Sequence, residues 1–205
     1  HDILRGSRAL KVEQSVCRAF ESPRFAILGS FASGLELFDT RVVRRKRTLV
    51  YRNTFDPNIL SLTLHPGIAI DQFDVLLTAK PHGIVLRSYG QGMVPEQLYP
   101  WLRRVTKKGI PVVLTSQMHR GTIDLSLYRK QIMLEELGVM SGEDMTFECA
   151  VVKLMWALAQ TKNPKKLRAL MQTKKVNKSN QWDVWIDREV VSTGDFDMNN
   201  VWERK

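Results

Sequence analysis

The amino-acid sequence predicts an α/β fold in which a small parallel sheet carries helices on both faces. Between residues 59 and 172, short apolar runs of strand length alternate with segments of helical periodicity. This alternation is typical of parallel strands joined by helical crossovers. Glycine or proline marks the junctions, as at residues 65–67, Gly109 and Gly138.

Three runs within this stretch have the character of strands. Leu60, Leu62 and Leu64 alternate with polar residues, which is the period of a half-exposed strand. Residues 83–86 and 110–114 are apolar along nearly their whole length, as expected for strands buried on both faces of a parallel sheet. The sequence therefore predicts at least three parallel strands.

Helices are predicted between and after these strands, over residues 69–77, 95–108 and 125–137. A longer helix begins near Thr146, because the apolar residues that follow it recur at the spacing of one helical face. Asp144 or Thr146 is expected to cap its start. A last helix is predicted from Pro164 to Met171, since proline suits the first turn.

The chain divides into four regions of different character. The first is mixed in composition, the second is a basic insert and linker, the third is the α/β domain, and the fourth is a tail without hydrophobic periodicity. The tail holds Trp182, Trp185 and Trp202 among polar residues, so we expect it to lie across a partner surface or this domain's own flank. The regions are residues 1–29, 30–58, 59–172 and 173–205.

The net charge is +10 over 205 residues, and the basic side chains are clustered. Such clusters attract polyanions, so we expect contact with RNA or anionic lipid through the first of them. A solvated surface, or a face against an acidic protein, fits the same pattern, and no aromatic residues are interleaved for base stacking. The first cluster contains Arg41, Arg44, Arg45, Lys46, Arg47 and Arg52, and the second contains Lys162, Lys165, Lys166, Arg168, Lys174, Lys175 and Lys178.

Several classes of protein and site are not supported by the sequence. No apolar run approaches the roughly 20 residues of a membrane-spanning helix. Cys17 and Cys149 are too far apart for a metal or redox spacing, so two free thiols are expected. Ser116, His119 and Asp124 lack the nucleophile elbow of a catalytic triad. The histidines do not fall at metal-ligand spacing, and we expect no metal and no cofactor.

Six stretches of the chain keep the order and spacing of one known family. The longest, residues 138–156, reads GVMSGEDMTFECAVVKLMW. It resembles the GVI-GGDMT-EAA-VKLMW segment of type I L-asparaginases and of the D subunit of archaeal glutamyl-tRNA amidotransferase. The resemblance covers about residues 3–28 and 59–172. The other five stretches are residues 4–12, 19–23, 64–68, 83–92 and 109–117.

The resemblance implies a two-domain hydrolase of side-chain amides, of which residues 1–29 are a remnant of the N-terminal domain. In this family a threonine hydroxyl attacks the carbonyl, and it needs a proton acceptor beside it. The family uses two threonines, a Thr-Asp pair and a lysine, and Lys11 matches the lysine. The threonines and the aspartate are expected upstream of residue 1, so Lys11 is either vestigial or an ordinary strand lysine.

The resemblance also marks two positions for substrate binding. Met93 stands where the family has an asparagine after the second glycine of the turn, and a thioether lacks the donor and acceptor of an amide. Glu148 stands at a carboxylate position at a helix start, where favouring the helix dipole is the simpler role. The departure at Met93 weakens the prediction of a working substrate site in this chain.

Two functions remain open at this point. In the first, the chain is an asparaginase-like domain without the catalytic threonines, serving as a structural or interaction subunit of a larger assembly, with a mitochondrial setting suggested by its charge. In the alternative, it is a fragment of an active L-asparaginase or glutaminase whose N-terminal catalytic half is not in this chain. Members of the family commonly pair through these domains, so either a homodimer or a place in a large assembly is expected.

Overall fold

The computed structural model describes residues 2–4, 6–16, 19–24, 27–31, 33–38 and 52–172. Two predicted features fall outside this part of the chain. The tail, residues 173–205, is one of them. The other is most of the basic insert, with the side chains Arg41, Arg44, Arg45, Lys46 and Arg47.

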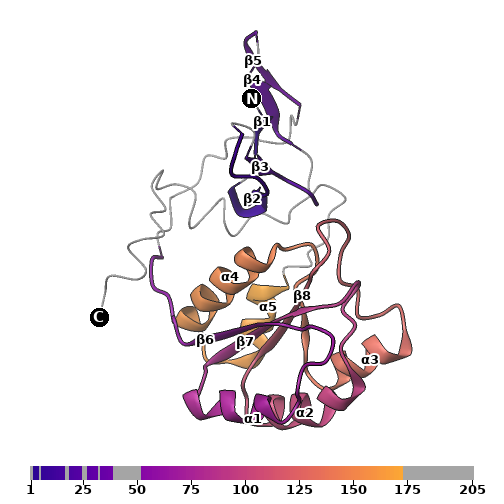
Figure 1. Cartoon of the computed structure of the whole chain (residues 1–205). Coiled ribbons are helices and arrows are strands. Elements are labelled where there is room, and N and C mark those ends of the chain that lie inside the picture. Colours follow the sequence, from indigo (N-terminus) through magenta and orange to yellow (C-terminus); the bar gives the residue numbers. More distant parts are fainter. Residues whose placement is uncertain are drawn as a thin grey trace.

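A four-stranded parallel sheet forms the centre of the α/β domain, which confirms the predicted fold class (Figure 1). Its strands run in the spatial order β6-β7-β8-β9, so each strand pairs with the next along the chain. The strands are β6 (Ile59–Thr63), β7 (Gly83–Ser88), β8 (Val112–Ser116) and β9 (Met140–Ser141).

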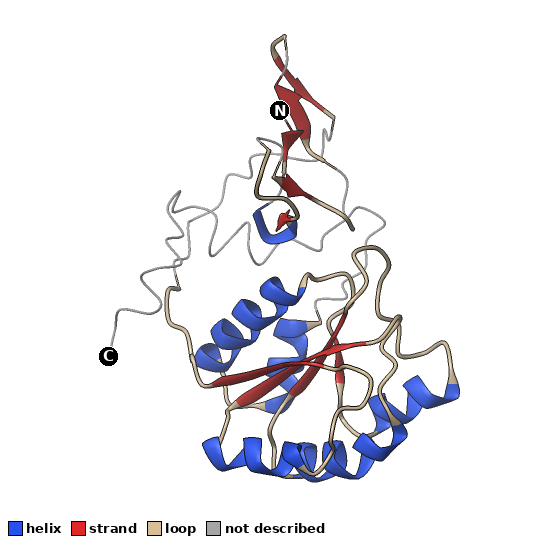
Figure 2. Ribbon diagram, viewed as in Figure 1, coloured by secondary structure: helices blue, strands red, loops and turns tan. Residues whose placement is uncertain are grey.

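Helices cover both faces of this sheet, as the sequence predicted (Figure 2). Alternate residues of one strand face opposite layers: Ile84 packs in one apolar cluster and Val85 in the other. The first cluster includes residues of three helices, α1 (Gln72–Leu76), α2 (Tyr99–Lys107) and α3 (Arg129–Glu136). The second includes residues of α4 (Phe147–Gln160) and α5 (Pro164–Met171).

Both helices of the second layer begin at side-chain caps. Thr146 Oγ1 accepts from Cys149 N at 3.2 Å and so starts α4, whereas Asp144, the other predicted cap, forms an ion pair elsewhere. Asn163 Oδ1 accepts from Lys165 N and Lys166 N at the start of α5. Cys149 lies on α4 as a half-buried free thiol.

Two predicted helix starts differ from the structure, and one strand was not predicted. The helix predicted from residue 125 begins only at Arg129, because Asp124 Oδ1 accepts from Ser126 N and Oγ and stabilises a turn there. The helix predicted from 95 opens with a 3₁₀ turn, η3 (Glu96–Leu98). Strand β9 was not predicted, because two residues are too few to show an alternating pattern.

The N-terminal segment forms small antiparallel pairs outside the main sheet. β1 (Asp2–Ile3), β4 (Gly29–Phe31) and β5 (Leu35–Leu37) make one sheet, and β2 (Leu10–Lys11) pairs with β3 (Phe20–Glu21). The region of the basic insert and linker thus contains strand structure near its start, at β5. Apolar side chains on this segment stay exposed in the described structure, namely Val12, Val16, Phe20, Phe31, Leu35, Leu37 and Phe38. No helix in the described part of the chain combines the length and apolar character that a bilayer crossing requires.

Candidate functional site

The carboxyl ends of β7, β8 and β9 meet at one edge of the sheet. In open α/β sheets, ligands bind outside the carboxyl ends of the strands. Hydroxyl groups at the edge serve the fold. Ser88 Oγ donates to Thr115 O at 3.0 Å, and Ser116 Oγ donates to Gly90 O at 2.5 Å. Ser116 Oγ also accepts from Met118 N at 3.0 Å.

Met93 lies in the tight glycine turn that follows β7. Tyr89 N donates to Met93 O and Met93 N donates to Tyr89 O, at 3.0 and 2.9 Å. Gly92 has a φ of 103°, which disfavours a side chain, and an added Cβ there would lie 3.0 Å from Ile123 Cγ2. The turn therefore holds Met93 at the surface with 42% of its side chain exposed.

Arg24, from the N-terminal segment, reaches into this edge of the sheet and contacts four main-chain carbonyls. Its Nη1 donates to Met145 O at 2.6 Å, its Nε donates to His119 O at 3.1 Å, and its Nη2 donates to Ser116 O and to Met118 O. These carbonyls belong to the last residue of β8, to the loop after it and to the turn before α4. The guanidinium fork thereby joins the N-terminal segment to two loops of the α/β domain.

A second arginine of the N-terminal segment makes a buried ion pair across the same junction. Arg8 Nη1 lies 2.8 Å from Asp144 Oδ1, and the two side chains are 5% and 13% exposed. Burial lowers the pKa of the Arg24 guanidinium. Asp144 and Glu148 act against this change, while Arg87 and Arg8 add to it. The charges of five side chains therefore influence one another at one site, whose net charge is positive: Arg8, Arg24, Arg87, Asp144 and Glu148.

Glu148 and Arg87 lie at the α4 side of this site. Glu148 is exposed in the first turn of α4, where a carboxylate favours the helix dipole. The Arg87 guanidinium lies 5.7 Å from the centre of the Phe147 ring, a cation–π contact. No described side chain here is a hydroxyl paired with a base, and the described residues hold no cluster of His, Cys, Asp or Glu suited to a metal ion.

Lys11 lies on β2, exposed, opposite Phe20 of β3. Its side chain makes no hydrogen bond or ion pair with any residue that the structure describes. The catalytic role of Lys11 and the substrate roles of Met93 and Glu148 remain predictions. Sequence reasoning missed Arg24 and the Arg8–Asp144 pair. Arg8 was inside a recognised stretch, but only the fold shows that it meets Asp144.

The described structure is a parallel α/β domain whose carboxyl edge contacts the segment that precedes it in the sequence. The family model of the glutaminase/asparaginase C-terminal domain matches residues 58–171. The chain belongs to the glutaminase/asparaginase family.

Curated relatives agree with this assignment. The chain is 30% identical to the D subunit of the glutamyl-tRNA(Gln) amidotransferase of Sulfurisphaera tokodaii over 179 residues, which cover 86% of this chain and 40% of the relative. It is 32% identical to the L-asparaginase of Thermococcus kodakarensis over 177 residues, covering 83% and 52%. The chain thus spans about half, or less, of the length of these relatives.

Solved structures show the same similarity. The thermostable L-asparaginase from Thermococcus kodakarensis matches with a TM-score of 0.70 and 29% identity, over 83% of this chain and 52% of that one. L-asparaginase I from Vibrio cholerae matches with a TM-score of 0.74 and 28% identity, over 86% and 54%. Both matches extend beyond the C-terminal domain, since residues 58–171 are a smaller share of the chain.

Proposed function

We propose that this chain is an asparaginase-like structural or interaction subunit that forms no hydrolytic site from its own residues. The proposal rests on one observation: polar side chains at the carboxyl edge of the sheet make their hydrogen bonds to main-chain carbonyls. The hydroxyls of Ser88 and Ser116 donate to carbonyls, and the Arg24 guanidinium occupies the carbonyls of two loops. Activation of a hydroxyl needs a base beside it, and Lys11 has no such hydroxyl among its described contacts.

The test is ammonia release from L-asparagine and L-glutamine by the natural protein, with the intact mass measured on the same sample. The proposal expects a mass near 23.6 kDa, no ammonia and a co-purifying polypeptide. Ammonia released by a sample of that mass would overturn it. A larger mass together with ammonia release would establish the alternative described next.

The alternative function is that of an amidohydrolase whose catalytic half lies outside this chain. The exposed apolar side chains of β3, β4 and β5 favour it, because Phe20, Phe31, Leu35 and Leu37 are each more than half exposed. Exposed apolar patches of this kind mark a surface that contacts another part of the protein or a partner. A Lys11→Met variant of the longer protein would then lose activity, and Glu36→Gln, on the same segment, would be the control.

The setting proposed for the subunit is a large assembly that carries polyanions, with a mitochondrial one suggested by the net charge of +10. The contact is proposed for five residues of the first basic cluster, namely Arg41, Arg44, Arg45, Lys46 and Arg47. Replacing these five residues by glutamine should weaken retention on RNA or on anionic vesicles and reduce its salt dependence. Unchanged retention on both would remove this part of the proposal.

A further inference from the structure

A groove of about 690 Å³ lies at the opposite edge of the sheet, beside the amino ends of β7, β8 and β9. Its volume is in the range of binding pockets for sizeable groups. Its floor is mainly apolar and its rim is basic. Leu137, Leu158 and Leu167 are representative of the floor, and Lys107, Lys162 and Arg168 lie on the rim.

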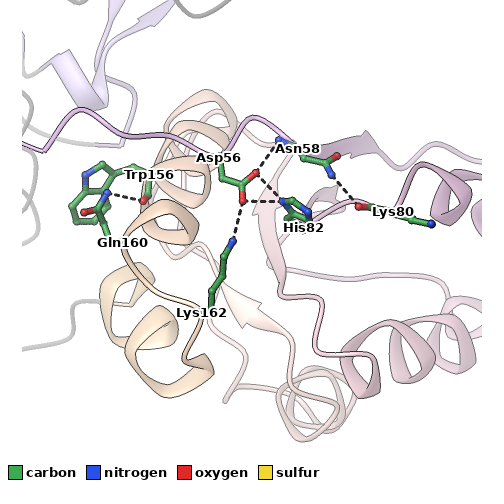
Figure 3. Close-up of polar contacts among 7 residues, drawn as sticks. All are labelled: Asp56, Asn58, Lys80, His82, Trp156, Gln160 and Lys162. Atoms are coloured by element: carbon green, nitrogen blue, oxygen red, sulfur yellow. Dashed lines mark hydrogen bonds and ion pairs between the residues drawn. The ribbon is translucent and has the colours of Figure 1, made fainter. Parts of the chain in front are cut away.

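The positive charge of this rim is only partly neutralised. Lys162 Nζ lies 3.2 Å from Asp56 Oδ2, and His82 Nδ1 lies 2.9 Å from the same carboxylate, as Figure 3 shows. Arg168 Nη2 donates to the carbonyl of Gly138 at 3.0 Å, but no carboxylate in the described part of the chain pairs with Arg168 or Lys107. Among the residues that the structure describes, Glu136 is the single carboxylate that lines the groove. An occupant with apolar side chains and negative charge fits both features.

A segment of this chain has that chemistry. Residues 182–203 contain six carboxylates and one arginine, a net charge of −5, in a chain whose total is +10. The same 22 residues hold three of the five tryptophans. The segment lies beyond the family domain, whose match ends at residue 171. Its charge is opposite to that of the domain it follows.

The connection is long enough for the segment to reach the groove. Pro164, Leu167 and Arg168 of α5 line the groove, and the helix ends at Met171, about 12 Å along its axis from its start. Residues 173–181 span up to about 30 Å when extended. A closer pocket, next to Gln172, is lined by Asp124, Glu135, Glu143 and Asp144, and no lysine or arginine is among its described lining residues, so it offers an acidic segment no cation of its own.

We propose that residues 182–203 dock into this groove of their own chain. The tryptophans cover the apolar floor, and the carboxylates lie against Lys107, Lys162 and Arg168. The groove then serves as the receptor of an intramolecular tail rather than as a site for a small ligand. This proposal does not depend on whether the chain hydrolyses an amide.

Zero-length carbodiimide cross-linking of the full chain tests the contact. We expect amide links from Lys107 or Lys162 to aspartates or glutamates of residues 182–203, detected by peptide mass spectrometry. Lys80 is the matched control, because it is exposed but does not line the groove. Links that join Lys80 to the segment as often as Lys107, or no links from either groove lysine, would overturn the proposal.

A mixture of isotope-labelled and unlabelled chains identifies the source of the segment. Docking within one chain gives links of a single label at low protein concentration. Links of mixed label would show that a second copy supplies the segment, and links to another polypeptide would show a foreign acidic partner. Either result would overturn docking within the chain.

Tryptophan fluorescence provides a second measurement. Trp101 and Trp156 are each 1% exposed, so acrylamide quenching reports chiefly on the three tryptophans of the segment. We expect Lys107→Glu to increase the quenching slope and Lys80→Glu to leave it unchanged. Far-ultraviolet circular dichroism verifies that both variants fold. Equal slopes in the two variants would contradict the proposal even if cross-links form.

Discussion

At the carboxyl edge of the sheet, Arg8 and Arg24 are drawn into the protein, whereas at the amino edge Lys107 and Lys162 stay at the surface. Arg8 is buried against a carboxylate, and the half-buried Arg24 meets four carbonyls. Lys162 is 74% exposed even while it pairs with Asp56. A guanidinium keeps its proton and offers several donors in a rigid fork, so main-chain oxygens can satisfy it away from water. An ammonium is a strongly hydrated point charge.

This difference assigns different roles to the two edges. The carboxyl edge uses its cations to join the N-terminal segment to the α/β domain. The amino edge leaves its cations available to an incoming group. Changes at the carboxyl edge are therefore expected to affect stability most, and changes at the amino edge to affect binding more than stability.

The largest effect is expected from Asp144→Ala. This change leaves the buried Arg8 guanidinium without its carboxylate, and loss of one partner of a buried pair lowers the free energy of unfolding by about 4 kcal/mol. Urea unfolding measures the loss. Asp74→Ala is the matched control, because its pair with Arg104 is more than half exposed and is worth less than about 1 kcal/mol. Equal losses would show that burial does not distinguish these pairs.

The second-largest effect is the pH dependence of the free energy of unfolding that is caused by Lys153, a buried lysine of α4. Its Nζ donates to Met171 O at 2.9 Å, and burial lowers the pKa of Lys153 from 10.5 to about 8. Between these two values the unfolded chain binds the proton that the folded chain has lost, so stability rises with pH. Relative to Lys153→Met, the wild type should gain about 3 kcal/mol from pH 8 to pH 10.5.

Urea unfolding of both proteins across this pH range measures the gain. Lys130→Met is the control, because the hydrogen bond with Glu96 raises the pKa of Lys130. The stability that this pair contributes is present below the unfolded pKa and is lost as pH rises, which is the opposite direction. A wild-type curve that stays parallel to the Lys153→Met curve would show that the buried ammonium keeps its proton.

Arg24→Ala comes third and tests the junction itself. It removes the donors of four carbonyls at a half-buried position, for a loss of about 2 kcal/mol in the free energy of unfolding. Hydrogen exchange should become faster at residues 19–24 and in the loop after β8. Arg24→Lys keeps the charge without the fork and should restore only part of the protection. If exchange in the N-terminal segment does not change, Arg24 does not hold the junction.

The sequence allowed the fold to be predicted further than the site. Local periodicity located β7 and α4 within a few residues, because burial on both strand faces and along one helical face leaves a regular pattern. Ser88, Ser116 and Ser141 end three neighbouring strands and so lie at one edge of the sheet. The sequence predicted parallel strands but not the register that brings these residues together. Periodicity carries no information about β9, which is two residues long.

The junction at the carboxyl edge could not be predicted, because it joins residues about 90 to 140 positions apart. Arg24 meets His119 and Met145 over separations of 95 and 121 residues, and its partners are main-chain carbonyls that any sequence supplies. Arg8 and Asp144 each lie in a recognised stretch, but two separate motifs do not indicate that they form a pair. Such contacts depend on how the segment docks, which only the folded chain determines.

The smallest effect is expected at the amino edge, from Asp56→Asn. Burial raises the pKa of Asp56, but the hydrogen bonds from His82 and Lys162 outweigh it and leave that pKa below its usual value. The stability gained from the charged carboxylate is therefore present above about pH 4 and is lost as pH falls through the lowered pKa. Because Lys162 and His82 are exposed, the variant should lose only about 1 kcal/mol at neutral pH.

Urea unfolding of wild type and Asp56→Asn at pH 7 and pH 3 measures both the size and the direction of this effect, and the difference should shrink in acid. Lys162→Met supplies the matched control, since it removes one partner and leaves the carboxylate in place. A loss as large as that of Asp144→Ala would make Asp56 a structural anchor of the same kind. The two edges would then hold their charges in the same way, and an acidic occupant of the groove would have to compete with Asp56 for Lys162.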